Sequence, residues 1–269
     1  MELKNGRRPK VSVIGAGNMG GAFCEALSKS DSIDLCVYDS FIPCAEKVAE
    51  GRRITVLKSM EEAASSHIVI IAVKPQVLPS VYASLAALKP DFFISIAAGV
   101  TLEKLRSNLK TDKVVRFMPN IAAKIGCAVT AVAYSPALSA SEKKEAMEVA
   151  QAVGSAFELE ENLFSAFIGI SGSGIAYMFE FMHQMAMGGV CEGIPYNKAL
   201  SIVADTMIGA ARLQKETGKN AVELETAVCS AKGTTIEGIA ALDEESFASG
   251  VISAVRAAAR RSEELEKKA

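Results

Sequence analysis

A glycine-rich turn near the start of this 269-residue chain limits its possible folds more than any other feature. The turn follows the apolar, strand-like run Val11–Ile14 and leads into a helical pattern. Its residues are Gly15, Ala16, Gly17, Asn18, Met19 and Gly20. In such a unit the first glycine permits the tight turn, the second leaves room for a pyrophosphate, and the third lets helix and strand pack closely. The pattern indicates a dinucleotide-binding fold, with the phosphates at a helix N-terminus.

An acidic residue, Asp39, completes this pattern, because it follows the next strand-like run, Ile33–Tyr38, at roughly the expected ~20 residues beyond the turn. A carboxylate at this position binds the ribose hydroxyls of NAD and repels the additional phosphate of NADP. Ser40 comes next and is able to donate a hydrogen bond to that phosphate, but no arginine stands beside it. We therefore expect NAD(P)H as the cofactor, with NADH used at least as well as NADPH.

Up to about residue 160, short apolar runs alternate with helical segments, which predicts an α/β domain with a Rossmann-type, doubly wound parallel sheet. Most runs are continuously apolar, as strands covered on both faces are. The predicted strands are Val11–Ile14, Ile33–Tyr38, Ile54–Val56, His67–Val73, Phe92–Ala98 and Val114–Phe117. A second, smaller β region, Ala128–Tyr134 and Ala156–Leu159, flanks a helix expected at Ser141–Val153, which Ser139 or Ser141 caps.

From Asn162 onward the strand signals vanish, so residues 1–160 are predicted to bind the dinucleotide and residues 161–269 to form an all-α domain. Helix breaks are expected near Gly188-Gly189, Gly193–Pro195, Gly218 and Ser230–Gly233. The uncharged segment Leu163–Phe179 is shorter than the roughly 20 residues that cross a bilayer, so a helix buried in protein or in a subunit interface is expected. The final charge run, RRSEELEKK, is typical of a solvated helix face.

Composition excludes several classes of protein. The formal net charge is only −2, so no strong positive field exists to collect the phosphates of a nucleic acid. The six cysteines lie far apart without a C-x-x-C pair, and there are only two histidines, so neither a metal site nor a disulfide framework is expected. No signal-peptide pattern precedes the first strand, and a reducing, cytoplasmic location is expected.

The loops that follow the later strands complete the predicted cofactor site, because ligands of open parallel sheets bind beyond the carboxyl ends of the strands. Lys74 is expected to contact the cofactor and Asn120 to hold an amide or a ribose. For each, a turn residue that caps the next helix is the alternative. The predicted cofactor-binding residues are Gly15, Gly17, Asn18, Met19, Gly20, Asp39, Ser40, Ala72, Val73, Lys74, Pro75, Ala97, Ala98, Gly99 and Asn120.

Four segments, in order and at matching spacing, resemble the pyrroline-5-carboxylate reductases over essentially the whole chain. They are Val13–Gly20 (VIGAGNMG), Ala72–Gln76 (AVKPQ), Val115–Asn120 (VRFMPN) and Ser171–Phe179 (SGSGIAYMF) with Ser230–Thr235 (SAKGTT) after it. The resemblance implies a Rossmann domain followed by a helical dimerisation domain, in a homodimer or a ring of dimers. It also implies NAD(P)H-dependent reduction of a cyclic imino acid, 1-pyrroline-5-carboxylate, to proline, with no membrane or nucleic-acid partner.

Carried over by motif, Ser230, Gly233 and Thr234 hold the substrate carboxylate, and Thr235 meets the ring nitrogen as the catalytic residue. A serine-threonine helix cap is the alternative for this loop. Hydride chemistry belongs to the nicotinamide, so the protein chiefly positions two carbons and stabilises charge. An imine that arrives protonated needs no strong general acid, which suits a chain without an obvious acid/base pair.

The chain departs from the family in this loop, where Ala231 and Lys232 replace the usual Pro-Gly. Lys232 either adds a charge-assisted contact to an anionic substrate or points to solvent. Other family residues are replaced by Ala122, Ile175 and Thr226. These changes leave open a paralogue with another imino-acid substrate or with weak activity. A 3-hydroxyacid-type dehydrogenase, whose catalytic lysine would be Met178 here, and a nucleotide-binding regulator without the reaction are two further alternatives.

Overall fold

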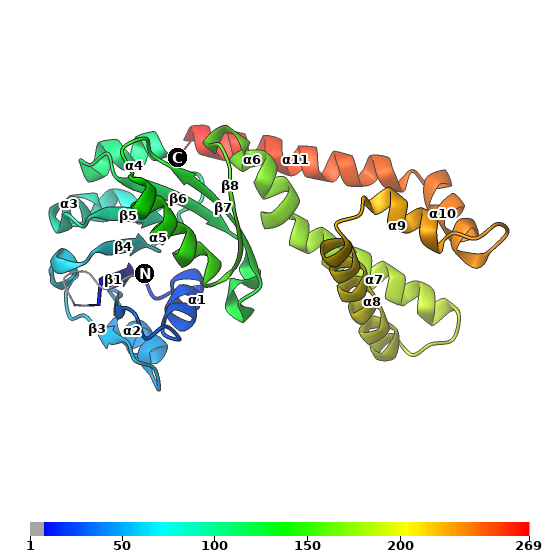
Figure 1. The fold of residues 1–269 in the computed structure, drawn as a ribbon, viewed down its shortest axis with the longest axis horizontal. Helices are drawn as coiled ribbons and strands as arrows, with labels where there is room; N and C mark the ends of the chain where they lie inside the picture. Colours follow the sequence, from blue (N-terminus) through cyan, green and yellow to red (C-terminus); the bar gives the residue numbers. More distant parts are fainter. Residues whose placement is uncertain (1–7, 269) are drawn as a thin grey trace. The chain divides into compact units, whose positions relative to one another are not determined.

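A computed structural model describes residues 8–268 of the chain. Its sheet has eight strands in the order β3-β2-β1-β4-β5-β6-β7-β8 (Figure 1). The strands are β1 (Lys10–Ile14), β2 (Asp34–Tyr38), β3 (Thr55–Val56), β4 (Ile68–Ile71), β5 (Phe92–Ser95), β6 (Val114–Pro119), β7 (Ala128–Tyr134) and β8 (Gly154–Glu158). β1 pairs in parallel with both β2 and β4, so the order of the strands reverses beside β1. This is the switch point at which open α/β sheets bind ligands.

The predicted second β region is wrong as a separate region, because β7 and β8 extend the same sheet. β7 pairs antiparallel to β6, whereas every other pair is parallel. The connection 120–127 holds only the 3₁₀ turn η2 (Ile121–Ile125). It is shorter than the dozen or so residues that a parallel crossover needs, so the chain returns antiparallel.

Two apolar cores on opposite faces of the sheet explain the continuously apolar strands. Ile68 and Ile70 of β4 belong to the core that α1 and α5 cover, whereas Val69 and Ile71 belong to the core under α3 and α4. Successive strand residues point to opposite faces, so both sets must be apolar. The helices of this part are α1 (Asn18–Leu27), α2 (Ile42–Ala49), α3 (Leu78–Leu88), α4 (Leu102–Leu109) and α5 (Ala140–Gln151), with the 3₁₀ turn η1 (Met60–Ser65). Ser139 caps α5 in a capping box with Glu142.

The remainder of the chain is helical. It comprises η3 (Glu161–Leu163), α6 (Phe164–Phe167), the π-helical turn η4 (Ile168–Gly172), α7 (Gly174–Cys191), α8 (Tyr196–Thr217), α9 (Ala221–Val228), α10 (Thr234–Glu244) and α11 (Phe247–Lys268). Three of the predicted breaks are confirmed, but α7 continues through Gly188-Gly189. A Cβ on Gly189 would lie 3.2 Å from the Cβ of Ala199 in α8, so this glycine serves helix packing instead of ending a helix.

The chain divides into two compact units, Met1–Gly172 with Ala258–Ala269, and Ser173–Ala257. The first unit thus extends past the sequence-based boundary at 160 and includes the end of α11. The buried Arg116 of β6 explains this return, because its guanidinium lies 2.7 Å from carboxylate oxygens of both Glu161 and Glu266. The terminal charge run is therefore not wholly a solvated face. Sequence patterns missed this pairing because the partners are far apart in the chain.

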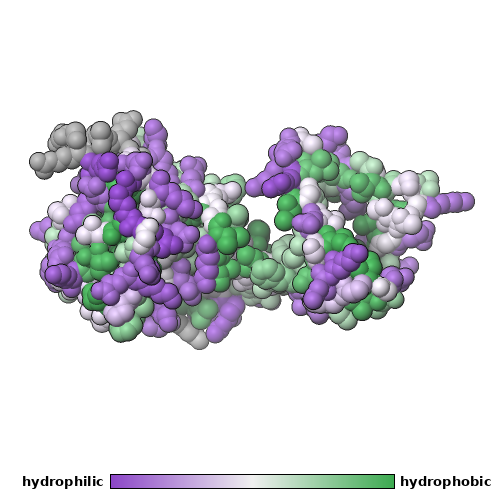
Figure 2. Space-filling model, turned by 90° about the horizontal axis from the view of Figure 1, so that it is seen from below, coloured by the Kyte–Doolittle hydropathy of each residue, from purple (hydrophilic) through white to green (hydrophobic). Residues whose placement is uncertain are grey.

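The helices of the second unit expose many large apolar side chains (Figure 2). These include Met178, Phe179, Met185, Ile202, Ile208, Leu213, Val228 and Ile252. The expected burial of the apolar segment is confirmed at its start, where Phe164 and Phe167 are buried, but not at its end, where Met178 and Phe179 are exposed. The length argument against a membrane span is also wrong, because the helical stretch Glu161–Cys191 is long and apolar enough to cross a bilayer by length and composition. An exposed apolar surface of this size is typical of a binding interface with another molecule.

Candidate functional site

The glycine turn has the shape that a bound pyrophosphate needs. Gly15 has a φ of +108°, and a Cβ there would lie 2.8 Å from the backbone of Ala72. A Cβ on Gly20 would lie 1.9 Å from the carbonyl oxygen of Gly15, so protein packing alone demands both glycines. A Cβ on Gly17, by contrast, would meet no atom of the described residues within 4 Å. The space over Gly17 is therefore open to a ligand.

The first turn of α1 is free to bind an anion. Gly17 is the N-cap residue, no side chain makes a cap hydrogen bond, and the turn carries no acidic residue. Asn18 and Met19 follow at the first helical positions, where N–H groups lack partners within the helix. Exposed donors and the positive end of the helix dipole favour a phosphate here. The residues present thus fit a dinucleotide.

Asp39 lies directly beside this turn. One carboxylate oxygen accepts a hydrogen bond from the N–H of Ala16 at 2.7 Å, and the other accepts from the N–H of Phe41 at 2.9 Å. The sequence predicted a ribose contact for this residue but not its link to the glycine turn. Ser40 is exposed, as is the ring of Phe41, of which 65 % is accessible. The residues predicted from the sequence do not include Phe41, which lies two positions after Asp39.

The loops after β4 and β5 reach the same edge of the sheet, because β1, β4 and β5 are consecutive parallel neighbours. The backbone N–H of Ala72 donates to the carbonyl of Ile14 at 2.8 Å, which joins the loop after β4 to the end of β1. The ammonium of Lys74 is exposed and makes no hydrogen bond or ion pair with the described residues. The other residues predicted here are Val73, Pro75, Ala97, Ala98 and Gly99, of which Ala97 is buried.

Asn120 serves as a structural cap. Its side-chain oxygen accepts hydrogen bonds from the N–H groups of Ala122 at 3.2 Å and Val129 at 3.3 Å, and its amide donates to Ser171 at 3.2 Å. The side chain is buried and holds β7 and η2 in place. The alternative proposed from the sequence, a turn residue that caps the next helix, is therefore confirmed. A cofactor contact for Asn120 stays a prediction.

The segment Ser230–Gly233 forms a tight turn before α10. The N–H of Gly233 donates to the carbonyl of Ser230 at 3.0 Å, and Lys232 has a φ of +58°. A positive φ at the third residue is the mark of a type II turn, which usually has glycine there. A Cβ on Gly233 would lie 2.2 Å from the Ser230 hydroxyl oxygen, so this glycine is required for the observed arrangement.

The turn leaves several donors exposed at the start of α10. Gly233 is the N-cap, and no side chain makes a cap hydrogen bond. Thr234 and Thr235 are exposed, and their hydroxyls have no hydrogen-bond partner among the described residues. The expected alternative, a helix cap formed by these side chains, is absent from this part of the structure. The loop can therefore present hydroxyl and N–H donors to a carboxylate.

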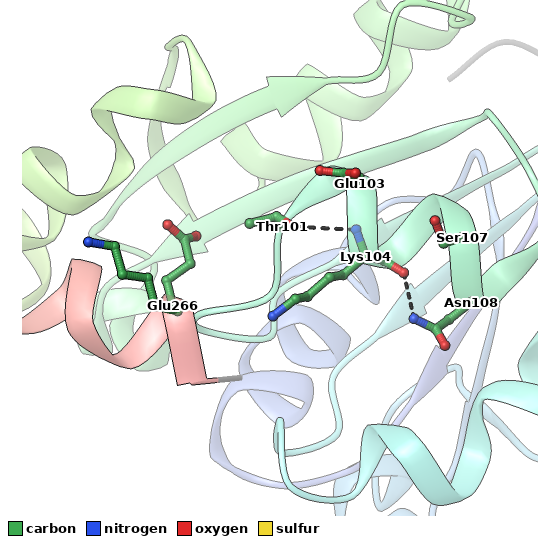
Figure 3. Close-up of a pocket in the computed structure, with 7 residues that line it drawn as sticks. Thr101, Glu103, Lys104, Ser107, Asn108 and Glu266 are labelled. Carbon is green, nitrogen blue, oxygen red and sulfur yellow. Dashed lines mark hydrogen bonds between the residues drawn. The ribbon is translucent and has the colours of Figure 1, made fainter.

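Other polar features lie outside the predicted site. A cleft of about 510 Å³ borders α4 and the end of α11, where Asn108 bonds to the carbonyl of Lys104 and Glu266 lies at the rim (Figure 3). None of the predicted site residues lines this cleft.

Burial raises the pKa of the Cys24 thiol to about 12, so this thiol is not a nucleophile. The described residues hold no group of three or more side chains able to bind a metal.

A glycine turn open to a phosphate at the switch point of a parallel sheet, followed by a helical part, is the arrangement of a two-part dinucleotide-dependent oxidoreductase. The family described as NADP oxidoreductase coenzyme F420-dependent matches residues 10–99. The family described as pyrroline-5-carboxylate reductase dimerisation matches residues 161–265.

Full-length relatives narrow the class further. The pyrroline-5-carboxylate reductase of Synechocystis is 41% identical and the match covers 96% of this chain and 99% of the relative. That of Aquifex aeolicus is 34% identical over 95% and 97% of the two chains. A pyrroline-5-carboxylate reductase structure from Coxiella burnetii matches with a TM-score of 0.91 at 26% identity, covering 96% of this chain and 99% of the other. The chain belongs to the pyrroline-5-carboxylate reductase family.

Membership decides between the classes that the sequence left open. The Rossmann-type sheet and the helical dimerisation domain are confirmed. A 3-hydroxyacid-type dehydrogenase is no longer favoured, because the full-length relatives of 41% and 34% identity are pyrroline-5-carboxylate reductases. A 3-hydroxyisobutyrate dehydrogenase from Mycobacterium tuberculosis, 13% identical with a TM-score of 0.50, shows a related fold alone. The dimerisation domain also shows that the chain self-associates.

Proposed function

We propose that this chain reduces 1-pyrroline-5-carboxylate to proline with NAD(P)H. Family membership supports the reaction, and a pyrroline carboxylate reductase from Plasmodium falciparum, 25% identical with a TM-score of 0.81, has NADP bound. The observation that carries the proposal is that one chain has two helices that begin at a glycine without a side-chain cap. One lies at Gly17, where the space over the backbone is open, and the other lies behind the Ser230–Gly233 turn.

The cofactor part of the site consists mainly of backbone. Gly15, Gly17, Asn18, Met19 and Gly20 receive the pyrophosphate at the start of α1. When bound, NAD(P)H supplies the hydride that the C=N carbon accepts. The exposed ammonium of Lys74 is suited to a phosphate, and Asp39 with Ser40 is suited to a ribose. The loop residues Ala72, Val73, Pro75, Ala97, Ala98, Gly99 and Asn120 complete the cofactor contacts.

The substrate part has different chemistry. Ser230, Gly233 and Thr234 hold the carboxylate through hydroxyl and N–H groups, and Lys232 adds a charge-assisted contact. Thr235 places its hydroxyl against the ring nitrogen and fixes the orientation of the C=N bond. Because the imine nitrogen carries a proton before reduction, Thr235 needs only to hold and orient this protonated nitrogen. This accounts for a substrate loop that contains no histidine and no carboxylate.

Self-association accounts for the exposed apolar helices. A second copy covers the apolar face of Glu161–Cys191, in a homodimer or a ring of dimers, and no lipid is involved. Residues 1–160 form the dinucleotide-binding domain and residues 161–269 the substrate-binding and dimerisation domain. The chain acts in the cytoplasm without a nucleic-acid partner or a metal.

A direct assay tests the reaction. In the first reactions the purified protein is mixed with NADH or NADPH and with either pyrroline-5-carboxylate or a six-membered cyclic imino acid. In a separate reaction it is mixed with a 3-hydroxyacid and the oxidised cofactor. We expect cofactor oxidation with the five-membered imine. Thr235→Val should lower kcat/KM about 100-fold, the low end of effects of a lost transition-state hydrogen bond. Turnover at background rates with every imine would refute the proposal.

Thr226→Val provides the matched control. Its hydroxyl donates to the carbonyl of Val222 within α9, at 2.8 Å, and the residue precedes the substrate loop. The same loss of a hydroxyl should therefore leave kcat/KM within about twofold of the parent value. An equal loss in both variants would mean that Thr235 acts on folding and not on the substrate.

A further inference from the structure

We infer that the turn after β2 is an adenosine site that selects NADH over NADPH, with Asp39 as the selecting residue. This inference rests on the proposed function, since it concerns the cofactor of that same site. The inference goes beyond the proposed function because it assigns a preference for NADH. The family that matches residues 10–99 is described by NADP, and the Plasmodium falciparum relative has NADP bound. Two observations on this turn point to an unphosphorylated ribose, and a third points to the adenine beside it.

The first observation is that the carboxylate is fixed in place. Asp39 accepts from the N–H of Ala16 at 2.7 Å and from the N–H of Phe41 at 2.9 Å, so both oxygens are held by backbone donors on two sides. Rotation of the side chain would break both hydrogen bonds. Each carboxylate oxygen has a second lone pair, which is able to accept from a ribose hydroxyl. A 2′-phosphate in the same place would meet a negative charge that cannot swing away.

The second observation is that the turn lacks a compensating cation. Between Asp39 and Glu46 the sequence has no lysine or arginine, and the first, Lys47, lies in the last turn of α2. Arg52 and Arg53, farther along, are already paired with the carboxylates of Glu25 and Asp31. Like charges at a few ångströms repel strongly where water is partly excluded. The turn therefore discriminates against NADPH by repulsion as well as favouring NADH by hydrogen bonding.

The third observation is an exposed aromatic ring beside the carboxylate. Phe41 is 65 % accessible, although its backbone N–H is held by Asp39. Val77, after β4, is also an exposed large apolar residue, at 42 %. These two loops lie on either side of β1 in the sheet order, where the glycine turn begins. A flat apolar base stacks well on such a ring, so Phe41 provides the face for adenine and Asp39 the partner for its ribose.

Calorimetric titration of the full-length protein with NADH and NADPH tests the inference without turnover. The parent should bind NADH at least about tenfold more tightly, given the size of the repulsion. Asp39→Ser should weaken the binding of NADH and reduce the preference for NADH over NADPH at least about tenfold. Phe41→Ala should weaken both cofactors about equally and leave their ratio unchanged. Asp34→Asn, an equal charge change at the exposed start of β2, should alter neither.

A second variant keeps the test decisive if Asp39→Ser disturbs the glycine turn. Ser40→Arg retains both hydrogen bonds of Asp39 and adds a cation, so it should shift the ratio toward NADPH about tenfold. Tighter binding of NADPH by the parent, or an unchanged ratio in both Asp39→Ser and Ser40→Arg, would overturn the inference. Imine reduction with an NADPH preference would overturn only this inference, whereas NADH binding without imine reduction would overturn only the proposed function.

Discussion

Replacing Lys232 by glycine should stabilise the protein, because the native backbone at this position suits glycine better. Lys232 has a φ of +58° at the third position of its turn. A left-handed backbone costs an L-residue roughly 1–2 kcal/mol. Glycine loses more backbone entropy on folding, about 0.5–1 kcal/mol relative to alanine. The difference predicts a net gain of about 0.5–1 kcal/mol for Lys232→Gly.

Urea unfolding at a fixed protein concentration measures this gain, since self-association makes stability depend on concentration. Ser246→Gly is the matched control, because Ser246 lies in the same unit with a φ of +60° and is also exposed. Both variants should be stabilised, but only Lys232→Gly should raise the KM for the imine, since Lys232 contacts the carboxylate in our proposal. A loss of stability in Lys232→Gly alone would refute the reasoning about its backbone.

Two further outcomes follow from local geometry. Gly17→Ala should leave the free energy of unfolding within about 1 kcal/mol of the parent value, because the added Cβ meets no described atom within 4 Å. The same variant should weaken cofactor binding at least about tenfold. Calorimetry that finds an unchanged affinity would contradict an open cofactor site at Gly17. For Glu142, burial raises the pKa, but hydrogen bonds from Lys113 and Ser139 outweigh it and lower the pKa below 4.5. A lowered folded-state pKa stabilises the protein above the unfolded value and is lost as pH falls through the folded value. Glu142→Gln should therefore reduce stability most near neutral pH and converge with the parent in acid, and a constant difference across unfolding curves from neutral to acidic pH would contradict this assignment.

The features that depend on local pattern were predictable from the sequence. The glycine turn, the runs that became β1 to β6 and the Ser139 cap each follow from neighbouring residues, and the structure confirms them. Continuously apolar runs correctly indicated strands with cores on both faces. The sequence also placed Asp39 at the end of the second strand, but its hydrogen bond to the N–H of Ala16 in the glycine turn became visible only in the structure.

The features that depend on distant parts of the chain were not predictable. The antiparallel β7 reflects the length of one connection, and the continuous α7 reflects the approach of Ala199 to Gly189. The pairing of Arg116 with Glu266 joins residues separated by most of the helical part. Apolar periodicity also cannot tell whether a helix is covered by its own chain or by another. Exposed side chains on α7 and α8 show that their own chain leaves them open.

The helix starts in this chain differ in a way that bears on ligand binding. Helices α4, α5 and α9 begin at Thr101, Ser139 and Asn220, whose side chains accept hydrogen bonds from N–H groups of the first turn. Helices α1, α2, α3, α7, α8 and α10 make no such bond, and α1 and α10 are the two of these six that begin at glycines. A capping side chain stabilises a helix by using the donors that an anion would need. Glycine costs only a few tenths of a kcal/mol relative to a good cap and leaves those donors open. The same device therefore suits both the pyrophosphate of the cofactor and the carboxylate of the substrate, and it explains why so few charged side chains are needed at either place.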